Sequence, residues 1–327
     1  MRRSTLAIRR RMVVTACAAC CAMPAVAQQY PTKPVRVVVP FGAGGPADIY
    51  ARYLAQRMSE TMGQQFIVDD RPGAGSIIGT ELVHSSPPDG YTLLMMSNTH
   101  TVNESLVPKK PFTLMKDFAG IAPVNYSDLL LVVHPTVPAK NVKELIALAK
   151  SRPKGMNYAS SGTGTPYHMA GELFKAMAHV DITHVPHKSS GDARTSVMSG
   201  QVEMMMDAIT TMAPLARSGR VRAIATTGLK RSSVMPEIPT VAESGVAGYE
   251  ATIWLGLMAP AGTPKAVVDK LNAEVNKILK RPDVKRAWNE QGAEPMIMSP
   301  AEFEKYLNQD IAKWAKIVKI SGARPEQ

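Results

Sequence analysis

The chain has 327 residues, of which 45% are hydrophobic and 20% are charged, and its formal net charge is +11. That length suits two domains, and the composition excludes a disordered, collagen-like or coiled-coil protein. No apolar run reaches the roughly 20 residues that a membrane-spanning helix needs. A positive charge favours an anionic partner, but part of this charge lies in a segment that we expect to be removed.

A cleavable secretory signal is predicted over residues 1–27. Five arginines open the chain, an apolar stretch follows at 12–23, and residues 25–27 read Ala-Val-Ala, an A-x-A cleavage site. Loss of these five arginines leaves the exported chain with a charge of +6. We therefore expect a periplasmic protein. A lipoprotein acylated at Cys20 or Cys21, and twin-arginine export, are the alternatives.

All the cysteines, Cys17, Cys20 and Cys21, fall inside the predicted signal. The exported chain would therefore have no disulfide, no thiolate zinc site and no cysteine nucleophile. Export also argues against nucleotide cofactors, which are made and recycled in the cytoplasm, so no cofactor is expected. Nucleic acid is not an expected partner either, because no Lys/Arg run is interleaved with aromatic residues.

Short apolar runs alternate with helical patterns along most of the chain. Strands are expected at residues 35–39, 66–68, 91–96, 129–133, 156–159, 182–185, 202–206 and 221–226. Helices are expected from Pro46, with Ile49, Tyr53, Met58 and Met62 on the apolar face, over 142–150 behind an Asn141 cap, and over 168–178. The C-terminal part is expected to be mostly helical, with one helix from 264 and another behind the capping box at 299–302.

This alternation predicts an α/β fold with two parallel-rich sheets flanked by helices. The C-terminal helices lack enough strands for a sheet of their own, so we expect them to pack on the first domain. The predicted layout is one lobe from 28–127 plus 250–327 and a second lobe from 128–249. The chain would then cross between the lobes near Leu129 and Thr252, and ligands would bind in a cleft beyond the carboxyl ends of the strands.

The first candidate binding segment is the Gly-rich loop at 42–47, which follows a strand and opens a helix. Glycines let a backbone approach a ligand closely, and free N–H groups at a helix start attract an anion. The loop also fits the loose dinucleotide pattern G-x-G-x-x-A, with Asp69 or Asp70 as the ribose acid. Export and the two residues between strand and first glycine argue against a dinucleotide. A plain strand-to-helix turn is the structural alternative.

Two further polar segments follow predicted strands. Residues 160–165 offer four hydroxyls and two glycines before a helix, which suits a carboxylate better than a metal. Residues 97–101 form a third cluster, which is either a ligand contact or a helix cap. His168 could donate a hydrogen bond to a ligand oxygen. Asp207 ends the strand at 202–206 and would face the cleft, unless it only caps the strand.

Motifs for catalysis and metal binding are scarce. The chain has no nucleophile elbow, no phosphate-binding Gly-Lys-Ser/Thr loop and no His-Glu-x-x-His. The pairs His184/His187 and His168/Glu172 have tolerable metal spacing but no obvious third ligand, so no metal is expected. A secreted hydrolase that uses Ser160 or Ser161 with His168 is the enzymatic alternative.

Several motifs together resemble the Bug family, the TctC-like solute-binding components of tripartite tricarboxylate transporters. They are PTKP at 31–34, VPFGAGGPAD at 39–48, DRPGAG at 70–75, PDGYTL at 88–93, NYASSGTG at 157–164, AGELF at 170–174 and APAGTP at 259–264. The match runs over nearly the whole exported chain in order. The chain departs from the family at 185–189, where VPHKS replaces the usual VPYKG, and at Ala208, where the family often has Asn.

The resemblance implies a two-lobed periplasmic-binding fold of type II that closes on a small carboxylate: a di- or tricarboxylate, an acidic amino acid or an aromatic acid. It implies delivery to two membrane subunits by a monomeric protein without catalytic activity; a periplasmic sensor that signals to a membrane kinase is the alternative. The family's ligand-binding positions carry over to Phe41, Gly42, Ala43, Gly44, Gly45, Pro46, Asp48, Ser97, Asn98, Thr99, His100, Ser160, Ser161, Gly162, Thr163, Gly164, Thr165 and Asp207. His168, near the start of a helix, is a further candidate from the sequence itself.

Overall fold

The computed structural model describes residues 30–152 and 155–325. The predicted signal at 1–27, with its cysteines, lies outside these residues. The chain divides into two units at Thr32/Lys33, and the second unit carries the fold described below.

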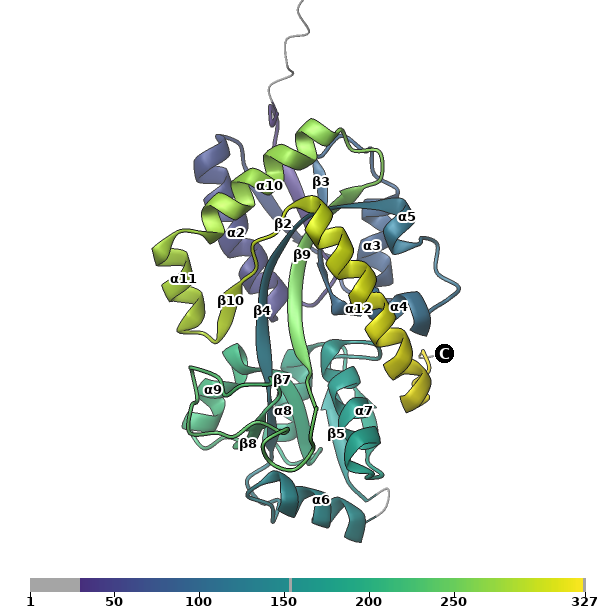
Figure 1. The fold of residues 1–327 in the computed structure, drawn as a ribbon, viewed down its shortest axis with the longest axis vertical. Helices are drawn as coiled ribbons and strands as arrows, with labels where there is room; N and C mark the ends of the chain where they lie inside the picture. The colour runs from purple at the N-terminus through teal and green to yellow at the C-terminus, as the bar shows by residue number, and fades with distance from the viewer. Residues whose placement is uncertain (1–29, 153–154, 326–327) are drawn as a thin grey trace, which may run out of the picture. The chain divides into compact units, whose positions relative to one another are not determined.

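A mixed sheet forms the centre of the second unit (Figure 1). Within the described residues it has ten strands: β1 (Val35–Val39), β2 (Phe66–Asp70), β3 (Thr92–Ser97), β4 (Phe118–Val133), β5 (Asn157–Ser160), β6 (Thr183–Pro186), β7 (Met204–Ala208), β8 (Arg222–Thr226), β9 (Thr252–Pro260) and β10 (Ala293–Pro295). Their order is β2-β1-β3-β9-β4-β7-β5-β6, and β8 and β10 also pair with β4.

Helices flank the sheet. They are α2 (Pro46–Met62), α3 (Ile77–His84), α4 (Asn98–Leu106), α5 (Leu114–Asp117), α6 (Val142–Ser151), α7 (Pro166–Ala178), α8 (Ser190–Met198), α9 (Ile209–Arg217), α10 (Lys265–Leu279), α11 (Pro282–Asn289) and α12 (Pro300–Ser321), together with the short 3-10 helix η2 (Ala74–Ser76). The predicted α/β class, with helices around parallel strands, is confirmed.

Parallel pairing is confined to the two ends of the sheet, and the long strand β4 joins them. β1 pairs in parallel with β2 and β3, and β5 pairs in parallel with β6 and β7. β4 runs antiparallel to β9 as far as Asp128, and from Leu129 it pairs antiparallel with β7 and β8 instead. Figure 1 shows β4 and β9 side by side between the two parallel groups.

The sequence pattern located most strands but missed the central pair. β4 spans 16 residues where only 129–133 was expected, and β9 was expected only as a short crossing. Both strands are buried almost throughout, so neither shows the alternation that marks a half-exposed strand. β4 also contains Pro123, which lies at an irregularity in the β4–β9 register, where a proline is tolerated.

The helix boundaries follow the predicted caps. Asn141 Oδ1 accepts a hydrogen bond from Glu144 N at 2.9 Å, and Ser299 forms a capping box with Glu302. The apolar face expected for α2 is displaced. Ile49 is 41% exposed, and the buried stripe runs through Ala47, Ala51, Leu54 and Met58. Alanines form part of this stripe, so the positions of the large apolar residues alone do not mark the buried face of α2.

The C-terminal elements pack against both early and later parts of the chain. β9 pairs with β3 and β4, β10 pairs with β4, and α10 packs on α2. Helix α12 contacts α4 and also α7. These contacts suit a first lobe built from both ends of the chain, but the boundaries at 127/128 and 249/250 stay a prediction.

Gly171→Ala should destabilise the fold although alanine is the better helix former. A Cβ at Gly171 would lie 2.3 Å from Tyr158 Cε2, and the Tyr158 hydroxyl donates to Glu172 Oε1 at 2.6 Å, so the ring cannot easily move. We expect a loss of about 2 kcal/mol, read from chemical denaturation. The matched control is Gly191→Ala in α8, where the nearest atom, Ser189 Oγ, is 3.5 Å away. Equal stability of the two variants would contradict this packing.

Asp128→Asn should stabilise the protein only at higher pH. Burial, with Glu294 and Glu250 nearby, raises the pKa of Asp128 to about 6. The folded chain therefore holds this proton more tightly than the unfolded chain, and wild-type stability falls as the pH rises from about 4 to about 6. Asparagine cannot ionise. We therefore expect the variant to gain about 1 kcal/mol on wild type between pH 4 and pH 8, after a discount for partial exposure.

Thermal melts of wild type and variant across that pH range measure the gain. The control is Asp181→Asn, at an exposed position. A difference in Tm between Asp128→Asn and wild type that stays constant with pH would refute the assignment.

Candidate ligand-binding site

A cavity of about 770 Å³ lies where the loops that follow β1, β2, β3, β5 and β6 meet. Each of these loops leads into the first turn of a helix. The N-cap residues of α2, α3, α4, α7 and α8 all line the cavity, and they are Gly45, Ser76, Ser97, Thr165 and Ser189. Five helix N-termini therefore surround one space.

The sheet topology produces this convergence. β1, β2 and β3 are parallel to one another, so their carboxyl ends lie at one edge, and β5 and β6 form a second such edge. The first turn of a helix has N–H groups without intrahelical partners, and the helix dipole adds roughly half a positive charge there. Five such ends make the cavity attractive to an anion.

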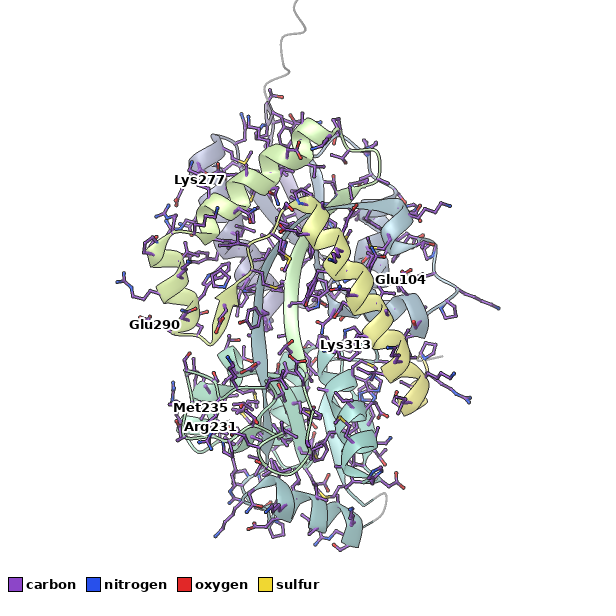
Figure 2. All side chains as sticks on the ribbon, viewed as in Figure 1. Glu104, Arg231, Met235, Lys277, Glu290 and Lys313 are labelled. Carbon is purple, nitrogen blue, oxygen red and sulfur yellow. The ribbon has the colours of Figure 1, made fainter. Side chains whose placement is uncertain are left out.

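The lining side chains have the same electrostatic preference. Among the described residues that line the cavity, none is acidic and three are lysines. Lys110 Nζ lies 2.8 Å from Glu104 Oε1 of α4, which Figure 2 labels. Lys109 and Lys188 are exposed and form no ion pair within residues 30–152 and 155–325.

Apolar side chains form much of the remaining wall. They are Phe41, Ile77, Leu106, Val107, Ile253 and Leu255. A volume of this size falls in the range of small-molecule sites, and an apolar wall with a few polar groups is typical of them. The cavity therefore suits a small organic anion rather than an inorganic ion.

Loops from the two parallel groups touch each other at the cavity. A Cβ built on Gly42 would lie 3.3 Å from Ser189 Cβ. A Cβ on Gly164 would lie 2.8 Å from Leu106 Cδ2 and 3.1 Å from Asn103 Oδ1, which leaves no room for a side chain. A ligand in the cavity would therefore be within reach of both groups of loops.

The predicted site residues divide into two sets. Nine of them line the cavity: Phe41, Gly42, Gly45, Pro46, Ser97, Ser161, Gly162, Thr163 and Thr165. The others do not line it and are Ala43, Gly44, Asp48, Asn98, Thr99, His100, Ser160, Gly164, His168 and Asp207. Of these, Ala43 and Gly44 are exposed and the rest lie behind the lining. The contacts of this second set show that several of them hold the loops in place.

Asp48 fixes the first loop from behind. Its Oδ2 accepts a hydrogen bond from Gly44 N at 2.8 Å, and its Oδ1 lies 2.5 Å from Arg52 Nε. Arg52 also reaches Asp70 Oδ2 at 2.7 Å, at the end of β2. The pair of carboxylates thus ties the loop after β1 to the end of the next strand rather than facing a ligand.

His100 caps helix α4. Ser97 N donates to His100 Nδ1 at 3.2 Å, and His100 Nε2 lies 3.0 Å from Thr80 Oγ1. Burial lowers the pKa of His100 to about 4, so the ring is neutral at pH 7. Asn98 Nδ2 donates to Thr252 O at 2.9 Å. Of this third cluster, only Ser97 reaches the cavity.

Histidines hold the second loop. Gly162 N donates to Ser160 Oγ at 3.1 Å, and Ser160 Oγ lies 2.6 Å from His184 Nε2. Gly164 N donates to His168 Nδ1 at 3.1 Å, and the His168 and His184 rings stack at 4.0 Å. Burial lowers the pKa of His184 to about 3. This serine–histidine pair therefore supports the loop backbone, and neither residue lines the cavity.

Asp207 is fully buried and paired. Arg194 Nη1 donates to its Oδ2 at 3.0 Å, and Ala208 N donates to its Oδ1 at 2.7 Å. Burial raises its pKa to about 6 against the opposing effect of Arg194. Tyr167, which lines the cavity, lies near Asp207. Asp207 therefore stands one side chain away from the cavity.

The sequence analysis missed a third lining loop, residues 72–77. Ala74 and Ser76 have φ of 47° and 78°, a left-handed conformation that costs a residue with a Cβ roughly 1–2 kcal/mol. Asn103 Nδ2 donates to Gly75 O at 2.8 Å and helps to hold the loop. The sequence does contain a pattern that could have identified this loop, because glycines follow the strand at 66–70 just as they follow the first strand. Ile253 and Leu255 were missed because β9 was not predicted.

The described residues contain no helix long and apolar enough to cross a membrane. Residues 30–152 and 155–325 also contain no group of three or more His, Cys, Asp or Glu side chains that could hold a metal ion.

Residues 50–323 match the model of the tripartite tricarboxylate transporter family receptor, TctC. The chain is also 34% identical to protein BugT of Bordetella pertussis over 305 residues, which cover 93% of this chain and 94% of BugT. The chain belongs to the Bug family of TctC-like periplasmic solute-binding proteins. The resemblance seen in the sequence motifs is thus confirmed, and the family is in general not enzymatic.

Two solved structures are similar over the whole fold. Rpa4515 of R. palustris with adipate is 35% identical, with a TM-score of 0.88 and coverage of 91% of this chain and 100% of that one. MatC of Rhodopseudomonas palustris with bound malate is 32% identical, with a TM-score of 0.83 and coverage of 88% and 100%. The predicted two-lobed periplasmic-binding fold is confirmed by this likeness.

Gly162→Val should weaken ligand binding in this Bug protein at least tenfold. Gly162 lines the cavity with φ of 114°, so a β-branched residue would both distort the loop and fill space at its N–H groups. Gly219→Val is the control: φ is 72°, a Cβ would meet no atom within 4 Å, and the position does not line the cavity. Calorimetric titration of wild type and both variants, with a carboxylate that wild type binds, measures the dissociation constants. Wild-type affinity in Gly162→Val would remove this loop from the site.

Proposed function

We propose that this Bug protein captures a small carboxylate in the periplasm and delivers it to the two membrane subunits of a tripartite tricarboxylate transporter. The observation that carries the proposal is the convergence of five helix N-termini on a cavity with no acidic side chain among its described lining residues. Such a site stabilises negative charge without a metal or a titratable base.

The cavity's shape and wall support an organic carboxylate as ligand. Phe41, Ile77 and Leu255 provide apolar surface for a carbon skeleton, and the loops at 42–45 and 161–165 bring the positive ends of helices α2 and α7 to the carboxylate. Similar proteins are seen with adipate and with malate, and both are small dicarboxylates. We include aromatic acids in the proposed class because the wall is largely apolar.

Capture would work through contacts from both groups of loops. A carboxylate at the helix starts of α2 and α7 is held from two sides only when the loops approach, as they do where Gly42 meets Ser189. A ligand that makes more contacts in the closed arrangement shifts the population toward it. The nine predicted residues that line the cavity are the proposed direct contacts, and the buried ones position them.

Binding without catalysis is the activity that these contacts support. The Ser160–His184 pair resembles a nucleophile with its base, but Ser160 is fully buried and its hydroxyl is engaged by Gly162 and His184. Ser161 lines the cavity, yet the His168 Nδ1 atom accepts from Gly164 N and serves the loop.

We propose that the exported protein is a monomer that begins at residue 28.

A thermal-shift screen of the exported chain tests the proposal. We expect carboxylates to raise Tm, because a ligand at a hundredfold excess over Kd stabilises by about 2.7 kcal/mol, and we expect no shift with sugars. Light scattering reports the oligomeric state, and uptake that needs both membrane subunits reports delivery. A sugar as the sole hit would refute the carboxylate. Turnover of an ester probe that Ser161→Ala abolishes would replace binding with hydrolysis.

A further inference from the structure

The side chain of His187 lines the cavity from the loop that follows β6. Its Nδ1 lies 3.0 Å from the main-chain oxygen of Val185. A carbonyl oxygen only accepts hydrogen bonds, so this contact places a ring hydrogen on Nδ1. In the neutral ring, Nε2 then has a lone pair and no hydrogen. Within the part of the chain that the structure describes, Nε2 has no hydrogen-bond partner.

The hydrogens next to this ring are already engaged. The main-chain His187 N donates to Ser160 O at 2.9 Å, and the Ser189 hydroxyl donates to Asp192 Oδ2 at 2.8 Å. Lys188 is exposed, and its charge attracts any anion alike. A carboxylate group has only lone pairs to offer, so it gains no hydrogen bond from Nε2. The ring of His187 therefore presents a hydrogen-bond acceptor in a wall whose other charged groups suit an anion.

We propose that His187 is a specificity-determining residue whose Nε2 accepts a hydrogen bond from the ligand. The site then prefers a carboxylate that carries a hydroxyl or a protonated amine over the same carboxylate without that group. The proposal rests on the proposed function, because it takes a small carboxylate as the ligand. The helix N-termini attract the carboxylate group, and His187 selects among the groups on the rest of the molecule.

The preference should be about fivefold in Kd, which is within the usual net size of one hydrogen bond. His187 is half-buried, so water can replace part of what a ligand without a donor fails to supply. Histidine side chains ordinarily change charge between about pH 5 and pH 8, and a charged ring donates from both nitrogens. The comparison is therefore made at about pH 8.5, above that range.

Calorimetric titrations of ligand pairs test the inference: malate against succinate, 2-hydroxyadipate against adipate, and mandelate against phenylacetate. Any further carboxylate that the thermal-shift screen finds is paired with its own hydroxylated or dehydroxylated counterpart. We expect wild type to bind the hydroxylated member of a pair about fivefold more tightly. The ratio should fall toward one in His187→Asn. The asparagine amide nitrogen can take the place of Nδ1 and keep the bond to Val185 O, but no atom takes the place of Nε2.

His134→Asn is the matched control. His134 Nδ1 also has a local partner, Thr136 Oγ1 at 2.7 Å, and His134 does not line the cavity. This variant should keep the wild-type ratio.

Nitrogen-15 NMR of the wild-type histidine rings decides if His187→Asn fails to fold. The spectrum should show the hydrogen of the neutral His187 ring on Nδ1. The Nε2 resonance should move when the hydroxylated member of a pair is added, and much less when the other member is added.

The possible results distinguish this inference from the proposed function. Equal binding of both members of each pair by wild type, or a ring hydrogen found on Nε2, would overturn the role of His187 and leave the proposed function intact. A ratio that survives His187→Asn, or an equal loss of affinity for both members, would reduce His187 to a structural role and overturn the inference. Failure of wild type to bind any carboxylate would overturn the proposed function and this inference with it.

Discussion

The parallel pairing of short strands determines the chemistry of this protein. When parallel strands share an edge, the helices that follow them begin at that edge, and the positive ends of their dipoles face the same space. Here β1, β2 and β3 supply one set and β5 and β6 a second, and β4 connects the two sets as one continuous strand. The cavity and the five helix N-termini around it depend on this arrangement.

The strands and loops that carry strong local signals could be predicted from the sequence, and the elements defined by distant contacts could not. β1, β5 and their glycine loops were found because strand, turn and helix start follow each other within a few residues. β9 carries Gly256 because a Cβ there would lie 2.4 Å from Phe303 of α12, a constraint that no local pattern reveals. The full length of β4 was hidden for a related reason, since burial on both faces removes any alternation.

The same limit applies within the site. The polar clusters at 97–101 and 160–165 were located correctly on the fold, but polarity alone does not say which way a side chain points. Ser97 and Ser161 reach the cavity, whereas His100 and Ser160 turn back to bind their own loops. Charged groups such as Asp48 and Asp207 lie behind the lining because Arg52 and Arg194 neutralise them there. Whether a polar group binds a ligand or supports a loop is decided by these long-range partners.

The proposed recognition of an anion at the helix starts has a consequence for how such a protein can evolve. Substitutions change side chains and leave peptide N–H groups in place, so mutation can reshape the wall at Phe41, Ile77 or Tyr167 without erasing the affinity for negative charge. Each variant would still bind the carboxylate group, and it could accept a ligand with a different carbon skeleton. A receptor built in this way can change its ligand specificity through the side chains that line its cavity, while the helix N-termini that attract the anion stay the same.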